Sequence, residues 1–159
     1  MLNVSKPDIL CVTETWFRPS STNNSIHNSN YSLFRKDRLD NREGGGVCIF
    51  TNNECISASQ VHVPEKFNSL ELVVLDVFLS ASVTKFRLFL CYRPPCYSEY
   101  CPEAITYTTQ LCECIQSLCP INSTVLLCGD FNFPAIKWDN NQNILNNTNT
   151  ASGIFLDFL

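Results

Sequence analysis

The amino-acid sequence predicts an α/β fold with a core rich in β-sheet. Of its 159 residues, 45% are hydrophobic and only 16% are charged, which excludes a disordered chain and suffices for one domain with a sizeable core. Short apolar segments with the pattern of β-strands recur along the chain. One longer segment, bounded by prolines, has the spacing of an amphipathic helix. No internal repeat or linker divides the chain, so we expect one domain.

The first half of the chain is predicted to form strands joined by polar connections. Apolar runs indicate strands at residues 9–12, 31–35, 47–50 and, more weakly, 55–63. The first run leads directly into Thr13-Glu14-Thr15-Trp16, so that a carboxylate follows the strand. Gly44-Gly45-Gly46 precedes the third run. It lacks the lysine and the helix of a phosphate-binding loop, which favours a structural role as a flexible approach to the strand.

The second half of the chain contains the predicted interior strands. Residues 70–77 are mostly apolar in both alternating sets, which is typical of a strand covered on both faces. The next strand, 86–92, ends at Arg93-Pro94-Pro95 because proline cannot continue a strand ladder. The run 124–129 predicts a buried, central strand that ends at Asp130.

Two helices are predicted in the same half. Apolar residues recur at helical spacing between Pro102 and Pro120. Near the end of the sequence, Ile154, Phe155, Phe158 and Leu159 indicate the apolar face of a second helix. Because the sequence stops inside this helix, we expect it to be truncated there.

The acidic composition limits the class of partner. The net charge is −4 and the sequence pI is about 5.1. A protein that binds nucleic acid mainly through backbone charge is normally basic, so this class is disfavoured. An enzyme that faces phosphate with a divalent cation remains compatible with this charge.

The ten cysteines do not indicate a zinc module, because no matched C-x-x-C pairs occur and only two histidines are present. Four of them lie inside apolar strands and are expected to be buried free thiols: Cys11, Cys48, Cys91 and Cys128. A disulfide remains open among a second group: Cys96, Cys101, Cys112, Cys114 and Cys119. No signal peptide or membrane-length apolar run is visible, so we expect an intracellular, reducing compartment and no membrane partner.

Polar groups follow three of the predicted strands. These are Glu14, Tyr92, and Asp130 with Asn132. Functional residues collect at strand ends because a rigid sheet holds loops that still reach solvent. Cleavage of a phosphodiester needs a carboxylate for a divalent cation, a group that activates water, and neutral donors for the phosphate oxygens. The three strand ends supply these types of group.

The chain resembles the endonuclease/exonuclease/phosphatase superfamily, whose fold is similar to DNase I and the abasic-site endonucleases. More narrowly, it resembles the endonuclease domain of non-LTR retrotransposons. The motifs that carry the resemblance run in order along nearly the whole chain: residues 7–16, Arg35-Lys36-Asp37-Arg38 with Gly44-Gly45-Gly46-Val47, Tyr92-Arg93-Pro94-Pro95, and Gly129-Asp130-Phe131-Asn132 with Pro134, Ile136 and Trp138. Each motif alone is weakly specific, whereas all four in this order are strongly specific.

The resemblance implies two mixed β-sheets packed face to face with flanking helices, a four-layer sandwich. It implies that Glu14 binds the metal, Tyr92 hydrogen-bonds the phosphate, Asp130 aligns or activates water, and Asn132 contacts the phosphate. The implied cofactor is Mg²⁺, or Mn²⁺ in its place, with no small-molecule cofactor. The implied substrate is DNA, nicked at a target site in the nucleus. A reverse transcriptase domain is implied in the parent polyprotein.

Two parts of the family pattern are missing from the sequence. The family carries an early asparagine strand, and Asn3 is too close to Glu14 to match it. The family also ends with Ser-Asp-His, and neither His27 nor His62 has Ser-Asp before it. We therefore expect a single partial domain over residues 1–159, truncated at both ends and with little or no activity.

Each of these residues also has a simpler, non-catalytic interpretation. Glu14 could be a surface residue, Tyr92 a core aromatic, and Asp130 with Asn132 an Asx turn. A basic cluster could contact the DNA backbone or form a solvated face: Arg35, Lys36, Arg38 and Arg42. Trp16 and Trp138 could be core anchors or rim residues.

Two alternative functions also remain open. One is a phosphoesterase of the same fold that acts on inositol phosphates or sphingomyelin. The other is a non-catalytic, degenerate relic. Residues 136–139 after the Gly-Asp-Phe-Asn motif favour the retrotransposon branch over the first alternative.

Overall fold

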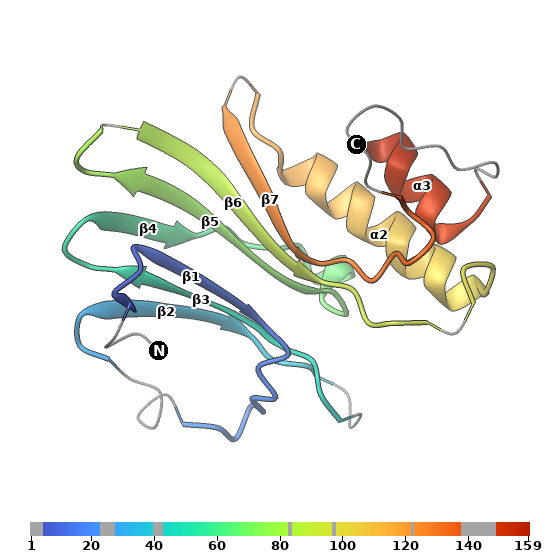
Figure 1. Ribbon diagram of the computed structural model, residues 1–159, viewed down its shortest axis with the longest axis horizontal. Helices are drawn as coiled ribbons and strands as arrows, with labels where there is room; N and C mark the ends of the chain where they lie inside the picture. Colours follow the sequence, from blue (N-terminus) through green and yellow to red (C-terminus); the bar gives the residue numbers. More distant parts are fainter. Residues whose placement is uncertain are drawn as a thin grey trace.

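The computed structural model describes residues 5–22, 28–39, 43–82, 84–96, 98–121, 123–137 and 149–159. Two β-sheets face each other, and two helices lie outside one of them (Figure 1). In the described part of the chain, helices flank only that sheet, so three layers are seen. The α/β fold with two packed sheets is confirmed.

The smaller sheet has the strand order β1-β3-β2, with both neighbouring pairs antiparallel. Its strands are β1 (Ile9–Thr13), β2 (Tyr31–Lys36) and β3 (Val47–Asn52). Thr13, the last residue of β1, pairs with Val47, the first residue of β3. Glu14 therefore leaves the sheet beside the glycine segment that precedes β3.

The larger sheet has the order β4-β5-β6-β7 and is mixed, because β6 and β7 are parallel while the other pairs are antiparallel. Its strands are β4 (Ile56–Gln60), β5 (Glu71–Leu79), β6 (Thr84–Tyr92) and β7 (Thr124–Asp130). A short 3₁₀-helix, η2 (Glu65–Phe67), precedes β5 and had no clear signal in the sequence.

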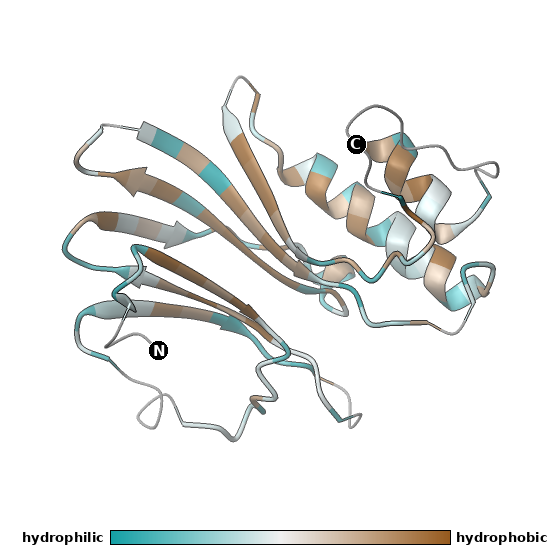
Figure 2. Ribbon diagram, viewed as in Figure 1, coloured by the Kyte–Doolittle hydropathy of each residue, from teal (hydrophilic) through white to brown (hydrophobic). Residues whose placement is uncertain are grey.

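The two faces of β5 are buried in different ways, as its double apolar pattern predicted. Val73, Leu75 and Val77 pack between the sheets. Leu72 and Val74 face the opposite way, toward the helix layer. The brown interior strands in Figure 2 show this concentration of hydrophobic residues. This rigid centre holds the strand ends that carry the candidate site.

Helices α2 (Pro102–Leu118) and α3 (Ala151–Phe158) confirm the two predicted helices. The Cys101 sulfur accepts a hydrogen bond from the Ala104 N–H at 3.3 Å, and Thr150 Oγ1 accepts one from the Gly153 N–H at 3.0 Å. Each helix is thus capped at its start. No helix in the described ranges is long and apolar enough to span a membrane.

One strand differs from its prediction. β7 lies at the edge of the larger sheet within the described chain, with Val125 36% and Leu126 50% exposed. The prediction of a buried central strand was therefore wrong, because every residue of β7 is exposed or half-buried and the strand has one neighbour in the described sheet. An apolar run shows that a segment forms a strand, but it does not identify which neighbours cover that strand.

Candidate active site

The carboxyl ends of β1, β6 and β7 meet at one end of the sandwich (Figure 1). The Tyr92 hydroxyl, at the end of β6, donates a hydrogen bond to Glu14 Oε1, just after β1. Tyr92 also pairs in register with Asp130 at the end of β7. The structure thus places Tyr92 next to both acids: its hydroxyl bonds Glu14 after β1 of the smaller sheet, and its backbone pairs with Asp130, the last residue of β7 in the larger sheet.

A glycine turn holds the Glu14 carboxylate from the other side. Gly45 N–H donates to Glu14 Oε2 at 2.5 Å. Gly44, Gly45 and Gly46 have φ values of +79°, +77° and +82°, which favour glycine strongly. A Cβ atom on Gly45 would lie 2.4 Å from the Arg38 guanidinium. The turn therefore has a structural role before β3, as predicted, and it also supplies a hydrogen-bond donor to the site.

An ion pair between Arg38 and Glu71 supports the glycine turn. Arg38 Nε lies 2.7 Å from Glu71 Oε1, and the second Glu71 oxygen accepts a hydrogen bond from Gly46 N–H. Glu71 is 5% exposed. The Arg38 side chain, which is 10% exposed, is thus ion-paired and not part of a solvated face. Glu71 was not among the predicted site residues, although a carboxylate at the start of an apolar strand was the available signal.

The electrostatics of the Glu14–Tyr92 contact favour a carboxylate beside a protonated phenol. Burial disfavours the charged form of Glu14, but the hydrogen bonds from Tyr92 and Gly45 and the charge of Arg38 outweigh it, so the pKa of Glu14 lies below its usual value. Burial, the hydrogen bond to Glu14 and the charge of Glu14 raise the pKa of Tyr92 to about 12. At neutral pH the site presents one anion and one phenolic donor.

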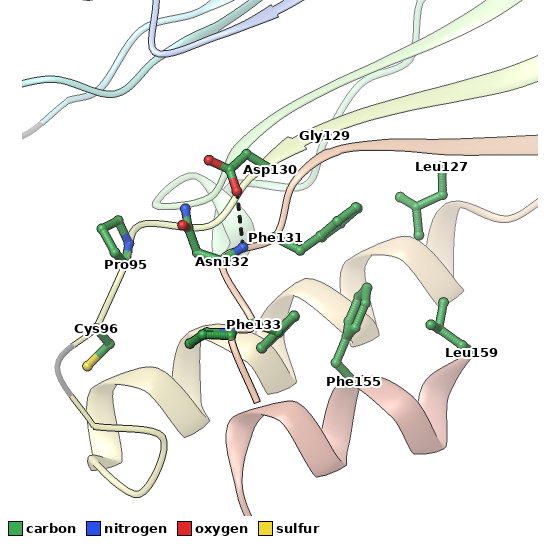
Figure 3. A pocket seen from close by; sticks show the side chains of 11 residues that line it. Pro95, Cys96, Leu127, Gly129, Asp130, Phe131, Asn132, Phe133, Phe155 and Leu159 are labelled. Atoms are coloured by element: carbon green, nitrogen blue, oxygen red, sulfur yellow. Dashed lines mark hydrogen bonds between the residues drawn. The ribbon is translucent and has the colours of Figure 1, made fainter. Parts of the chain in front are cut away.

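Asp130 and Asn132 lie beside a cleft of about 740 Å³ (Figure 3). Asp130 is exposed, and its Oδ1 accepts a hydrogen bond from the Asn132 N–H at 3.2 Å, as an Asx turn would. Asn132 Nδ2 donates to the Arg93 carbonyl at 2.8 Å. Because an amide nitrogen carries two hydrogens, a second donor remains for a ligand.

The structure also shows the surroundings of one tryptophan and of two residues of the basic cluster. Trp16 is 63% exposed and is therefore a rim residue rather than a core anchor. Arg35 forms an ion pair with Asp37 at 2.8 Å. Lys36 is half-buried and hydrogen-bonds Asn68. Three other candidates lie outside the described residues: His27, Arg42 and Trp138.

The cysteines agree with the expectation of free thiols. Cys48 and Cys91 are buried inside their strands, while Cys11 and Cys128 are half-buried. Both thiols of another pair, Cys96 and Cys101, are free, and their sulfur atoms lie 2.7 Å apart. This pair borders the cleft through Cys96.

A divalent metal is compatible with this site through few protein ligands. The described residues contain no group of three or more His, Cys, Asp and Glu side chains that could hold a metal ion. Mg²⁺, however, is commonly bound by one or two carboxylates and keeps several waters. Glu14 is an oxygen ligand whose lowered pKa favours the anion. The donor set fits a magnesium ion held by Glu14 and water.

Comparison of the sequence with protein families identifies the chain. A profile described as "Endonuclease/Exonuclease/phosphatase family" matches residues 1–150. The chain belongs to this family. The family-level expectation, a phosphoesterase fold of the DNase I type, is therefore confirmed. A search of curated proteins found no match.

Solved structures support the same fold. The human Nocturnin catalytic domain is 12% identical, with a TM-score of 0.60 over 83% of this chain and 54% of that one. TDP2 of D. rerio in complex with a single-strand DNA product is 17% identical, with a TM-score of 0.55 over 83% of this chain and 50% of that one. The AP endonuclease LMAP of Leishmania major is 16% identical, with a TM-score of 0.58 over 81% of this chain and 47% of that one. The chain thus spans about half the length of these structures.

Proposed function

We propose that this family member hydrolyses phosphodiester bonds of DNA at the strand-end site, with a divalent metal bound by Glu14. The observation that carries this proposal is the hydrogen bond from Tyr92 to Glu14, which joins the two sheets directly beside Asp130. These side chains supply a ligand for a divalent cation, a neutral hydrogen-bond donor for a phosphate oxygen and a group that can accept a proton from water.

Each side chain has a distinct task in this mechanism. Tyr92 remains protonated at neutral pH, and its single phenolic hydrogen turns from Glu14 to a phosphate oxygen as negative charge builds there. Asn132 contributes its second amide hydrogen to the same group. Asp130, exposed at the cleft, orients the attacking water and accepts its proton. A bound Mg²⁺ or Mn²⁺ would neutralise phosphate charge next to Glu14.

We further propose that the biological substrate is a DNA target site nicked for retrotransposition. Support comes from the order of the four sequence motifs, including Tyr-Arg-Pro-Pro and Gly-Asp-Phe-Asn, along nearly the whole chain. This role places the protein in the nucleus and in one polyprotein with a reverse transcriptase domain.

The test of catalysis is nicking of supercoiled plasmid by the 159-residue chain in Mg²⁺ or Mn²⁺, where we expect weak nicking because the sequence lacks the Ser-Asp-His of the family. Asp130→Asn and Tyr92→Phe should each slow nicking about 100-fold, the size typical for loss of one such group. Asp157→Asn, on the exposed side of α3, is the matched control and should nick at the wild-type rate. Equal rates in the wild type and Asp130→Asn would reject these roles.

The test of metal binding is a thermal shift in Mn²⁺. A ligand at about 100 times its Kd stabilises a protein by about 2.7 kcal/mol, so the wild-type Tm should rise by several degrees. Glu14→Gln should lose this rise, whereas Glu113→Gln, an exposed residue of α2, should keep it. If Mn²⁺ does not raise the Tm and the chain does not nick DNA, the non-catalytic relic is favoured. If the chain releases phosphate from inositol phosphates but does not nick DNA, the alternative phosphoesterase of the same fold is favoured.

A further inference from the structure

Arg93 is a buried cation at the site that the proposed chemistry does not use. It follows Tyr92 in the Tyr-Arg-Pro-Pro motif and is 2% exposed. Its Nε donates to Thr108 Oγ1 on α2 at 3.1 Å, and its Nη1 donates to the Asn132 carbonyl at 2.9 Å. Its guanidinium carbon lies 4.2 Å from the centre of the Phe133 ring. The side chain therefore connects the end of β6, helix α2 and the loop after β7.

The backbone of Arg93 binds the same loop. Its N–H donates to the Asp130 carbonyl at 2.9 Å, and its carbonyl accepts the Asn132 side-chain amide at 2.8 Å. Asn132 is thus held by Arg93 at its own carbonyl and at its side chain. Asp130 is held by the same residue at its carbonyl. A single residue fixes both groups that we assign to water and phosphate.

The loop requires such support because its backbone is unusual. Asn132 has a φ of +49°, in the left-handed region that costs an L-residue about 1 kcal/mol or more. Asparagine tolerates this region better than most residues, but the conformation persists only when surrounding contacts over-determine it. The Arg93 contacts supply that restraint from two directions.

The chemistry of Arg93 also argues against simple space filling. Burial lowers the pKa of its guanidinium, which reflects the cost of removing a charge from water. The groups that offset this cost are the charge of Glu99, a hydroxyl, a carbonyl and an aromatic face. A planar guanidinium donates in fixed directions while its flat face stacks on a ring, whereas a lysine ammonium has no flat face and apolar side chains have no donor.

We propose that Arg93 is a positioning residue, which fixes the Gly129–Phe133 loop so that Asn132 and Asp130 face the phosphate and the water. Its catalytic consequence rests on the proposed function, but its structural effect on Asn132 does not. The structural effect on Asn132 and the effect on catalysis can therefore be measured separately on the same variants.

The first measurement is the Asn132 side-chain amide signal in ¹⁵N NMR spectra of the full chain, assigned by its loss in Asn132→Asp. In the wild type, one amide proton is bonded to the Arg93 carbonyl and the other is not, so their shifts should differ from those of exposed asparagines. Arg93→Met should move the signal toward the exposed-asparagine position and speed its hydrogen exchange about 10-fold or more.

The matched control is Arg87→Met. Arg87 lies on β6, six positions before Arg93, bonds the Leu118 carbonyl of α2, and pairs with Asp76 at 2.7 Å. Its removal should lower the Tm without moving the Asn132 signal. Arg93→Lys retains the positive charge but not the planar guanidinium. Its Asn132 signal should therefore lie between those of the wild type and Arg93→Met. If Arg93→Met does not fold, the Asn132 signal of Arg93→Lys is compared with that of Arg87→Met instead.

The second measurement is the kinetics of plasmid nicking. Arg93→Met should lower kcat about 100-fold with little change in KM, because small displacements of positioned groups have effects of this size. Arg87→Met should leave both constants near wild type. An unchanged Asn132 signal in Arg93→Met would overturn the positioning role whatever the activity. If the Asn132 signal moves in Arg93→Met but the wild type does not nick DNA, the positioning role of Arg93 stands and the proposed function is rejected.

Discussion

The Tyr92–Glu14 contact gives a sharp prediction because it changes the ionisation of a single phenol. The pKa of Tyr92 is raised from 10.0 to about 12 by burial, the hydrogen bond to Glu14 and the charge of Glu14. At pH 10.5 a phenol with a pKa of about 12 is roughly 3% ionised, whereas one with a pKa of 10 is roughly 76% ionised. Tyr92 should therefore contribute almost no tyrosinate at this pH.

The assay is the ultraviolet absorbance of tyrosinate at pH 10.5, with the fold monitored by circular dichroism. The wild-type and Tyr92→Phe spectra should nearly coincide in the tyrosinate band. Tyr100→Phe, which removes a phenol that is 65% exposed, provides the reference for the loss of one accessible tyrosine. A Tyr92→Phe difference as large as most of one tyrosinate would show that the contact with Glu14 is absent in solution.

The same shift predicts how stability depends on pH. A tyrosine whose pKa is higher in the folded state stabilises that state fully below pH 10, and this contribution is lost as pH rises toward 12. Between pH 8 and 11 the calculated loss is up to about 1.4 kcal/mol. Urea unfolding of both proteins should show the wild-type advantage over Tyr92→Phe shrinking by that amount. An advantage that grows with pH would refute the reasoning.

Two further predictions concern the glycine turn and the cysteine pair. Gly45→Ala should destabilise the chain by about 2 kcal/mol or more in urea unfolding, because its φ is +77° and its new Cβ would lie 2.4 Å from the Arg38 guanidinium; a loss below about 0.5 kcal/mol would contradict this geometry. Mild oxidation with glutathione disulfide should join Cys96 to Cys101, whose sulfur atoms lie 2.7 Å apart, with the loss of two hydrogens seen by peptide mass mapping. Cys96→Ser should prevent this link and Cys119→Ser should not, whereas a map with both thiols still free would count against the pairing.

Much of the fold was predictable because its elements depend on local patterns. Proline at 94 and 102 marks a strand end and a helix start, and both boundaries are observed. The double apolar pattern of β5 predicted burial on both faces, and its residues do pack in two separate clusters. The edge position of β7 was not predictable, because strand order depends on long-range pairing and not on the composition of one strand.

The family and the four strand-end residues were recognisable from sequence alone, because motif order is a property of the chain. The contacts that give these residues their chemistry were not. Glu14 and Tyr92 are separated by 78 positions and meet only because two sheets pack against each other. Gly45 reaches the Glu14 carboxylate because β1 pairs with β3 in the smaller sheet, which is also a long-range contact. The sequence thus determined which groups are available, whereas the tertiary structure decided which groups share a hydrogen bond, because side chains far apart in the chain become neighbours only when apolar faces are buried together.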